Sequence, residues 1–248
     1  MISVVMITKN SQRTLFDSLA SVSFLDEIIL IDTGSSDNTI NIAKTFPNVR
    51  IYYKSFSSFS SLRNEGANLA KNDWILALDS DEILSQDLKK EIKALLFFDK
   101  TKIYSIPFLN YYRKKQIKCC GWHKERHNRL YHRKIVQFKQ NHLHEKIEGK
   151  NIKKLFSPIY HHSYHSIDDF LTKMQRYSSL FAKEFHGKKK SSLRKAFCHS
   201  IYAFFKSYII KKGFLGGKEG LIISTYIANT TFYKYLKLME INEKPPCF

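Results

Sequence analysis

Two carboxylates directly follow an apolar run, and they are the residues of this chain most able to do chemistry. Trp74–Leu78 is apolar throughout and leads into Asp79-Ser80-Asp81-Glu82. The run predicts a strand buried on both faces, as in a parallel sheet. Clustered negative charge at its end is costly unless a positive charge meets it. We therefore predict that Asp79 and Asp81 bind Mg²⁺ or Mn²⁺, for which carboxylates are preferred ligands. A solvated acidic loop is the alternative.

Polar residues also end two earlier apolar runs. Thr8 and Asn10 follow the first, and Asp32 follows the second. Predicted strands and helices alternate over the first hundred residues, which indicates β-α-β units and a parallel sheet. Loops after parallel strands meet at one edge, so these residues should lie close to the acidic pair. Such an edge suits a nucleoside diphosphate, with Asp32 accepting from the ribose or base and a metal on the diphosphate. Neither a G-x-G-x-x-G nor a Walker A pattern is present.

The charge of the chain is distributed unevenly. The net charge is +19 over 248 residues, of which residues 1–100 carry −2 and residues 101–248 carry +21. Such a surface can meet nucleic acid, an anionic membrane or a phosphorylated substrate. No helix-turn-helix, RNP or zinc-finger pattern favours nucleic acid, which we exclude as a partner. The four cysteines show no C-x-x-C spacing, and we find neither a leader nor a spanning apolar run. These features predict a cytoplasmic protein, soluble or peripheral.

Four motifs follow one another in the first hundred residues: Ser3–Asn10, Asp32–Asp37, Arg63–Gly66 and Asp79–Glu82. Together they resemble the family-2 glycosyltransferases. The resemblance implies the GT-A fold, a Rossmann-like, mostly parallel sheet flanked by helices, and a UDP-sugar donor. It implies that Thr8, Asn10 and Asp32 surround the nucleoside and that Arg63 lies beside the diphosphate. It implies that Asp79 and Asp81 bracket the metal and the ribose–diphosphate. A salt bridge for Arg63 and a helix cap for Asp37 are the structural alternatives.

The second part of the chain resembles a narrower group, the lipopolysaccharide inner-core β-glucosyltransferases of Gram-negative bacteria. The resemblance implies transfer of a hexose, with glucose as the expected sugar, onto a lipopolysaccharide core acceptor. Another cell-surface glycan, or a metal-dependent nucleotidyltransferase reaction, is the alternative. The matching residues are Asn128–Tyr131, His144-Glu145, His161–Tyr164, Lys173, Tyr177-Ser178, Gly213–Leu215 and Gly220.

Family-2 enzymes are associated with inversion, and a single displacement needs a carboxylate to take the proton of the acceptor hydroxyl. We predict Glu145 as this base and Glu148 as the second choice; pairing with a lysine is the structural alternative for Glu145. The histidine-rich segments match no zinc pattern. His161 or His162 could instead be an additional ligand of the catalytic metal or form a hydrogen bond with the diphosphate.

We predict two domains. Residues 1–165 would form the GT-A nucleotide-sugar-binding and catalytic domain, and residues 166–248 a basic, mainly helical extension that contacts the acceptor or a membrane. Within the extension, residues 191–212 predict an amphipathic helix with basic flanks. It could lie on an anionic bilayer, at the cytoplasmic face of the inner membrane, or pack on the catalytic domain. Its apolar face is predicted to contain Phe197, Ile201, Phe204, Phe205 and Tyr208.

Overall fold

The computed structural model describes residues 1–123, 125–139 and 146–243. Its internal contacts divide the chain into two compact units. The first unit comprises residues 1–109 and 124–162, and the second comprises residues 110–123 and 163–248. Each unit has a hydrophobic core of its own.

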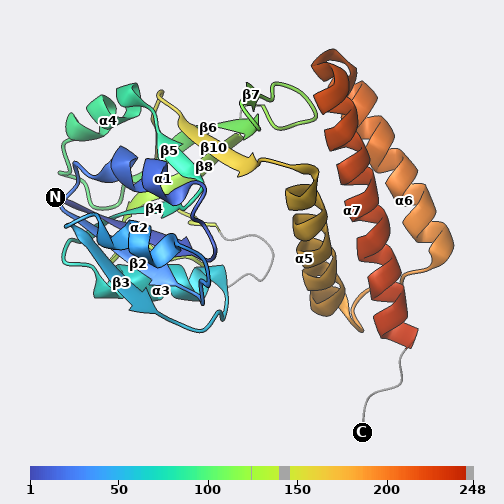
Figure 1. Cartoon of the computed structure of the whole chain (residues 1–248), viewed down its shortest axis with the longest axis horizontal. Helices are drawn as coiled ribbons and strands as arrows, with labels where there is room; N and C mark the ends of the chain where they lie inside the picture. The colour runs from blue at the N-terminus through green and yellow to red at the C-terminus, as the bar shows by residue number, and fades with distance from the viewer. Residues whose placement is uncertain (124, 140–145, 244–248) are drawn as a thin grey trace, which may run out of the picture. The chain divides into compact units, whose positions relative to one another are not determined.

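The first unit is built on a sheet whose strands follow the order β3-β2-β1-β4-β8-β6-β10-β5 (Figure 1). The strands β3, β2, β1 and β4 are parallel, whereas β8 runs antiparallel to β4 and to β6. The bounds are β1 (Ile2–Thr8), β2 (Glu27–Asp32), β3 (Val49–Tyr53), β4 (Trp74–Asp79), β5 (Glu82–Leu84), β6 (Ile103–Tyr112), β7 (Lys115–Gln116), β8 (Glu125–His132), β9 (Ile152–Lys154) and β10 (Ile159–Tyr164).

Helices cover both faces of the parallel strands. Side chains of a strand alternate between faces, so Val4 and Met6 enter one core cluster and Val5 and Ile7 the other. The first cluster also contains buried residues of α1 (Leu15–Val22), α2 (Thr39–Lys44) and α4 (Gln86–Lys93). The second contains residues of α3 (Phe59–Leu69). This double cover explains why the strands are apolar at nearly every position.

The close approach of α3 to the sheet depends on Gly66. A Cβ atom at this position would lie 2.5 Å from Cγ1 of Val5 and 3.0 Å from Cδ1 of Ile31. We expect Gly66→Ala to lower the free energy of unfolding by about 1–3 kcal/mol in urea denaturation, the usual cost of overpacking a core. The double variant Val5→Ala/Gly66→Ala should lose less stability than the sum of the losses in the two single variants, because alanine at position 5 makes room for the new methyl group. Unchanged stability of Gly66→Ala would contradict this account of the packing.

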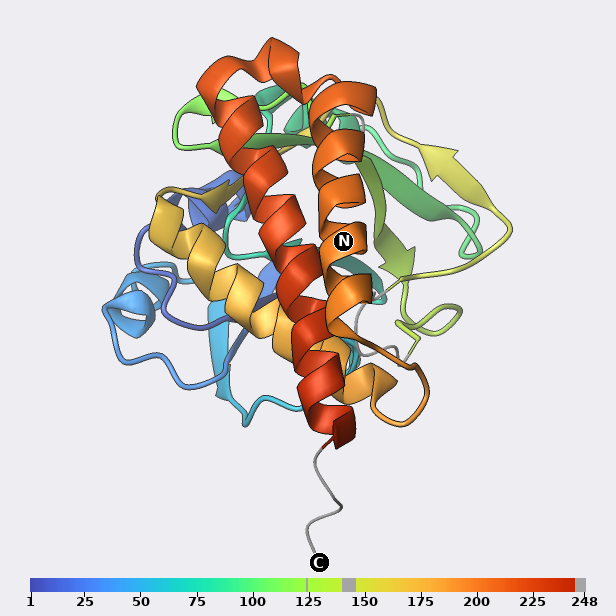
Figure 2. The same ribbon diagram turned by 90° about the vertical axis from the view of Figure 1, so that its right-hand side faces the viewer.

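The second unit is mainly helical. Its helices are α5 (Ile167–Phe185), α6 (Leu193–Phe205) and α7 (Gly217–Glu243), and α7 contacts both of the others (Figure 2). A π-helical turn, η1 (Lys206–Ile210), continues α6, and a 3₁₀ turn, η2 (Gly213–Gly216), leads into α7. The start of α5 is fixed by a capping box, in which Ser166 and Asp169 accept hydrogen bonds from each other's N–H groups.

The predicted α/β fold class is confirmed: a sheet that is parallel through its first four strands is flanked by helices, and the C-terminal part is helical. The observed division differs from the predicted one at 1–165 and 166–248. Residues 110–123 belong by their contacts to the second unit, because Ile117, Cys119 and Cys120 share a core with Tyr164 and Ile223. The functional roles assigned to the two parts stay predictions.

Candidate active site

The predicted donor-site residues of three strands are neighbours at one edge of the sheet. In the parallel register Thr8 of β1 lies opposite Asp32 of β2, and Ile7 of β1 lies opposite Asp79 of β4. The carboxyl ends of parallel strands form the usual ligand-binding edge of an α/β sheet. The predicted convergence is therefore confirmed, while the binding roles of the individual residues stay predictions.

Asp32 organises the loop that follows β2. Its Oδ2 accepts hydrogen bonds from the N–H groups of Gly34 and Ser35, each at 3.0 Å, and its Oδ1 accepts from the hydroxyl of Ser35. The neighbouring Thr8 differs, because its Oγ1 is buried and has no hydrogen-bond partner among the described residues. A buried polar atom without a partner is unusual. Thr8 thus offers an unused hydroxyl at this edge.

Asn10 and Asp37 join the loop after β1 to the loop after β2. Asn10 adopts a φ of 51°, which asparagine tolerates better than most residues, and its Oδ1 accepts a hydrogen bond from the N–H of Ser36 at 2.8 Å. Asp37 accepts hydrogen bonds from the N–H groups of Thr39 at 3.0 Å and Gln12 at 3.2 Å. Both side chains therefore shape the site, and Asp37 makes the local contacts expected of a residue at a helix start.

The Arg63–Gly66 segment of α3 has a separate contact for each of its polar residues. Asn64 makes two hydrogen bonds with the backbone of Phe138, at 2.9 and 3.0 Å. Glu65 lies 3.4 Å from the Nζ of Lys54. The guanidinium of Arg63 lies over the ring of Phe138, with its carbon 4.9 Å from the ring centre. These contacts of Arg63 and Asn64 hold Phe138 against α3.

Two arginines neutralise Asp79. Nη2 of Arg63 lies 2.7 Å from its Oδ1, and Nη2 of Arg129, on β8, lies 3.3 Å from its Oδ2. Burial raises the pKa of Asp79, but the charges of Arg63 and Arg129 lower it more, so the net pKa lies well below its ordinary value. Asp79 is thus ionised with both oxygens engaged by arginine. Metal binding by Asp79 stays a prediction.

Glu82 and Arg129 form a buried ion pair behind Asp79. The Glu82 side chain is 1% exposed and that of Arg129 is 9% exposed, and Glu82 also accepts a hydrogen bond from the N–H of Asp79 at 2.9 Å. Burial raises the pKa of Glu82 despite the nearby charge of Arg129. The pair therefore holds the end of β4 in place, with Arg129 shared between two carboxylates.

Asp81 is the second predicted metal ligand, and its carboxylate is partly exposed, as that of Asp79 is. Its side chain is 28% exposed, and its Oδ1 lies 3.6 Å from Nε2 of His161 on β10. No group of three or more His, Cys, Asp or Glu residues that could hold a metal occurs among the residues described. Mg²⁺ is commonly bound by one or two carboxylates together with substrate phosphates. Asp81 and His161 fit a cation shared with a diphosphate, and they do not form an all-protein metal centre.

The predicted base, Glu145, lies outside the described residues, as do His142 and His144. The second choice, Glu148, is exposed, and its Oε2 lies 2.5 Å from Nζ of Lys139. The hydrogen bond from Lys139 lowers the pKa of Glu148. A carboxylate held by a surface lysine in this way is a weaker proton acceptor than an unpaired one.

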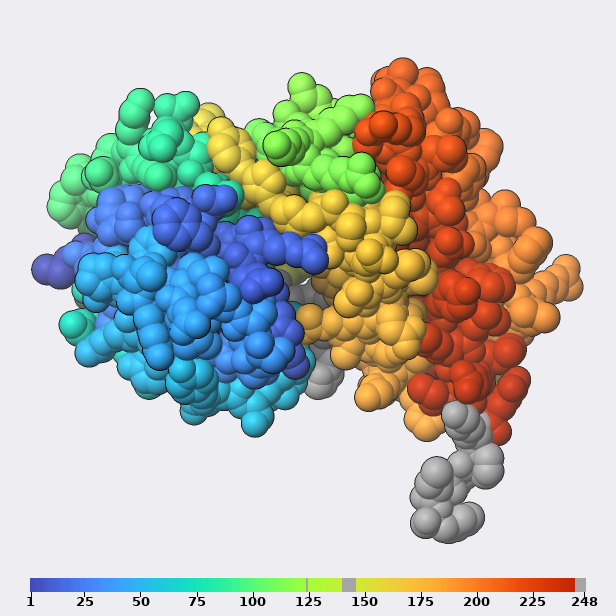
Figure 3. Space-filling model, viewed as in Figure 1, coloured from blue at the N-terminus to red at the C-terminus, as the bar shows by residue number. Residues whose placement is uncertain are grey.

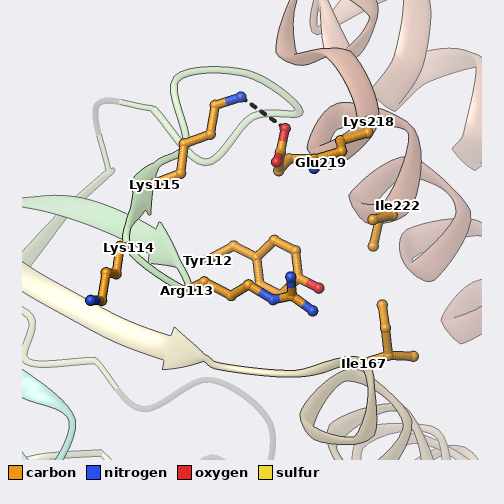
Figure 4. Close-up of a pocket in the computed structure, with 8 residues that line it drawn as sticks. All are labelled: Tyr112, Arg113, Lys114, Lys115, Ile167, Lys218, Glu219 and Ile222. Atoms are coloured by element: carbon orange, nitrogen blue, oxygen red, sulfur yellow. Dashed lines mark hydrogen bonds and ion pairs between the residues drawn. The ribbon is translucent and has the colours of Figure 1, made fainter.

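A separate hollow of about 470 Å³ lies within the second unit (Figure 4). Within it, Nζ of Lys115 lies 2.8 Å from Oε2 of Glu219, and the Arg113 guanidinium lies 5.4 Å from the ring centre of Tyr112. Its lining contains four basic residues and one acidic residue, which gives it a positive potential. The lining residues are Tyr112, Arg113, Lys114, Lys115, Ile167, Lys218, Glu219 and Ile222.

Arg129 is the site residue that the sequence did not predict. Arg129 lies in the matching segment Asn128–Tyr131, for which the resemblance implies no individual roles. The available signal was an arginine beside Leu130 and Tyr131, which are both fully buried in β8. A buried arginine needs a carboxylate partner, and Arg129 pairs with Asp79 and Glu82. Its partner could not be identified without the pairing of β4 with β8.

Comparisons with known proteins identify glycosyltransferases as relatives of this chain. The family model of glycosyl transferase family 2 matches residues 3–154. An uncharacterized glycosyltransferase of Rickettsia prowazekii is 31% identical over 260 residues, which cover 98% of this chain and 88% of that protein. An uncharacterized glycosyltransferase of Rickettsia typhi matches to the same extent. A crystal structure of S. aureus TarS 1–349 in complex with UDP aligns with a TM-score of 0.46 and 14% identity, over 96% of this chain and 90% of that one.

Proposed function

The chain belongs to glycosyl transferase family 2, and on that premise we propose that it transfers glucose from UDP-glucose to a lipopolysaccharide core acceptor. The observation that carries the donor half is the edge where β1, β2 and β4 end. It combines the unused hydroxyl of Thr8, two buried arginines and the partly exposed Asp81. This set matches the chemistry of a nucleoside diphosphate. Family membership favours sugar transfer over the nucleotidyltransferase alternative.

In the proposed donor site each residue has a defined task. Thr8 and the loop ordered by Asn10 and Asp32 would surround the nucleoside. Arg63 and Arg129 would hold Asp79 beside the ribose and diphosphate by pairing with its carboxylate. Because the contacts of Asp32 lie within its own loop, its contribution would be to hold the loop in shape for the nucleoside.

Asp81 and His161 are the residues that would hold the proposed Mg²⁺ or Mn²⁺. The ion would neutralise charge that develops on the leaving UDP. The imidazole of His161 must be neutral to act as a ligand. Its position on β10 places a nitrogen beside the carboxylate of Asp81, in the turn between β4 and β5.

The proposed displacement is a single step that inverts the anomeric carbon. The acceptor hydroxyl attacks that carbon, the bond to UDP breaks, and a carboxylate takes the hydroxyl proton. We assign this carboxylate to Glu145. The base has to be separate from the metal ligands, because a carboxylate bound to a cation is a poor proton acceptor. Glu148, the second choice, is already paired with Lys139.

The acceptor half of the proposal is supported by charge. The second unit contains 19 Lys and Arg residues against 6 Asp and Glu residues. Its basic hollow, with Arg113, Lys114 and Lys218 in the lining, could bind a phosphate or sugar carboxylate of the acceptor. A lipopolysaccharide core carries such groups. Another anionic cell-surface glycan would satisfy the same chemistry and is the alternative acceptor.

The donor assignment is tested by calorimetric titration of UDP, GDP, ADP and CMP, each with Mn²⁺ and with EDTA. We expect binding that is selective for UDP. This binding should weaken when the metal is removed, because the cation would join the diphosphate to Asp81 and His161. The Thr8→Val variant, which removes only the hydroxyl, should bind UDP less tightly. Equal binding of all four nucleotides, or binding of none, would contradict the proposal.

A further inference from the structure

One side of α6 is apolar and exposed. Leu193, Phe197, Ile201 and Phe205 recur every four residues and are 61%, 60%, 56% and 54% exposed. Tyr202 lies beside them and is 57% exposed. These five residues are called the α6 face below. The space-filling view shows the orange atoms of this helix at the surface of the second unit (Figure 3). A contiguous apolar patch on a solvent-exposed surface marks an interaction site.

The apolar surface continues beyond the end of α6. The turns that follow contain four more large apolar side chains that are between 43% and 69% exposed, namely Ile209, Ile210, Phe214 and Leu215. Phe204 and Tyr208, which the sequence placed on the same face, are instead only partly exposed, and their rings stack with centres 5.4 Å apart. The exposed surface is therefore larger than predicted and shifted around the helix.

The opposite side of α6 already holds the helix in the unit. Ala196 is fully buried and Ser207 is 3% exposed. The hydroxyl of Ser200 donates a hydrogen bond to the backbone carbonyl of Ala228 in α7 at 2.9 Å. The fold of the unit leaves more than half of each side chain of the α6 face exposed.

The charge around the α6 face has one sign. Residues 185–218 contain nine Lys and Arg residues and no Asp or Glu. Nζ of Lys206 lies 5.7 Å from the ring centre of Tyr202, next to the apolar surface. An apolar stripe with cationic flanks complements the acyl region and the anionic headgroups of a bilayer. Two copies of this face would bring like charges together, which opposes self-association.

We propose that the α6 face lies in the interfacial layer of an anionic lipid bilayer, with α6 parallel to the membrane plane. Phe197, Ile201 and Phe205 would enter the boundary between headgroups and acyl chains, while Arg194 and Lys206 would meet lipid phosphates. No helix among the described residues is long and apolar enough to cross a bilayer. This proposal is independent of the donor and acceptor proposed above.

The test is sedimentation of the full chain with vesicles, without nucleotide or metal, so that its outcome does not depend on the sugar-transfer proposal. We expect binding to vesicles of equimolar phosphatidylcholine and phosphatidylglycerol, weaker binding to phosphatidylcholine alone, and loss of binding at high salt. The variant Phe197→Ser/Ile201→Ser should bind the anionic vesicles at least about a hundredfold more weakly, about tenfold for each side chain.

The matched control is Phe98→Ser/Phe156→Ser, which removes apolar side chains that are 86% and 89% exposed in the first unit. It should bind like the unmodified chain, and both variants should keep its thermal unfolding midpoint because the changed residues are exposed. Equal vesicle binding by the α6 variant and the control would overturn the proposal. So would a concentration-dependent dimer that the α6 variant loses while vesicle binding is unchanged, because the face would then be an interface between copies.

Discussion

Asp81→Ala should lower kcat/KM for sugar transfer by at least about a thousandfold, the size expected when a metal contribution of several kcal/mol is lost. The Asp81 carboxylate is partly exposed and lies beside His161, and both oxygens of Asp79, which is exposed to a similar extent, face arginines. Removing this carboxylate takes away the ligand proposed for the cation on the diphosphate. The measurement is steady-state transfer with Mn²⁺, together with calorimetric UDP binding.

Two further variants make that result specific. Asp73→Ala removes a carboxylate that is 31% exposed, close to the 28% of Asp81. Asp73 precedes the first residue of β4, at the end of that strand opposite the donor edge, so this variant should keep transfer activity. Glu145→Gln should keep UDP binding and lose about 10²–10⁴-fold in kcat, the usual contribution of a general base. Full activity of Asp81→Ala would exclude it as the metal ligand, and normal turnover of Glu145→Gln would move the base elsewhere.

Arg129→Met should lower the free energy of unfolding by about 3–5 kcal/mol, because it leaves a buried carboxylate without its partner. Glu82 is 1% exposed and pairs with Arg129, which also contacts Asp79. Methionine retains much of the volume of the arginine side chain, so the loss reports the charge rather than a cavity. Urea denaturation monitored by circular dichroism measures it.

The contrast with other charge changes identifies the cause. Arg50→Met removes the arginine partner of another buried acid, Glu27, but Arg50 is 48% exposed and Glu27 keeps hydrogen bonds from Ser3 and Lys71. Its loss should stay near 1 kcal/mol or below. The double variant Glu82→Gln/Arg129→Met should be more stable than Arg129→Met alone. A loss in Arg129→Met no larger than in Arg50→Met would show that the buried pair does not stabilise this edge.

The composition of the donor edge could be predicted from the sequence because it depends on local signals. Each apolar run identified a strand, and each polar residue after a run identified the end of one. The rule that parallel strands end at a common edge then placed Thr8, Asp32 and Asp79 together, as the register confirms. The sequence does not explain why residue 66 is a glycine. The reason, a Cβ atom that would lie 2.5 Å from Cγ1 of Val5, appears only when α3 is packed on the sheet.

Partners distant in the sequence could not be predicted in the same way. Arg129 and Asp79 are 50 residues apart, and only the pairing of β4 with β8 brings them together. That contact lets Asp79 share Arg129 with Glu82, and the pairing of β10 with β5 brings His161 beside Asp81. Likewise, helical periodicity identified an apolar stripe around Phe197, but the side of α6 that contacts α7 decided which residues are exposed.

By itself, the sequence of this protein determined the strands, their polar ends and the positive charge of its second part, because these depend on neighbouring residues and composition. The tertiary structure alone decided the charge balance around Asp79 and the exposed surface of α6. Both depend on which distant side chains exclude water from a group or supply its counter-charge, and chain folding sets those distances.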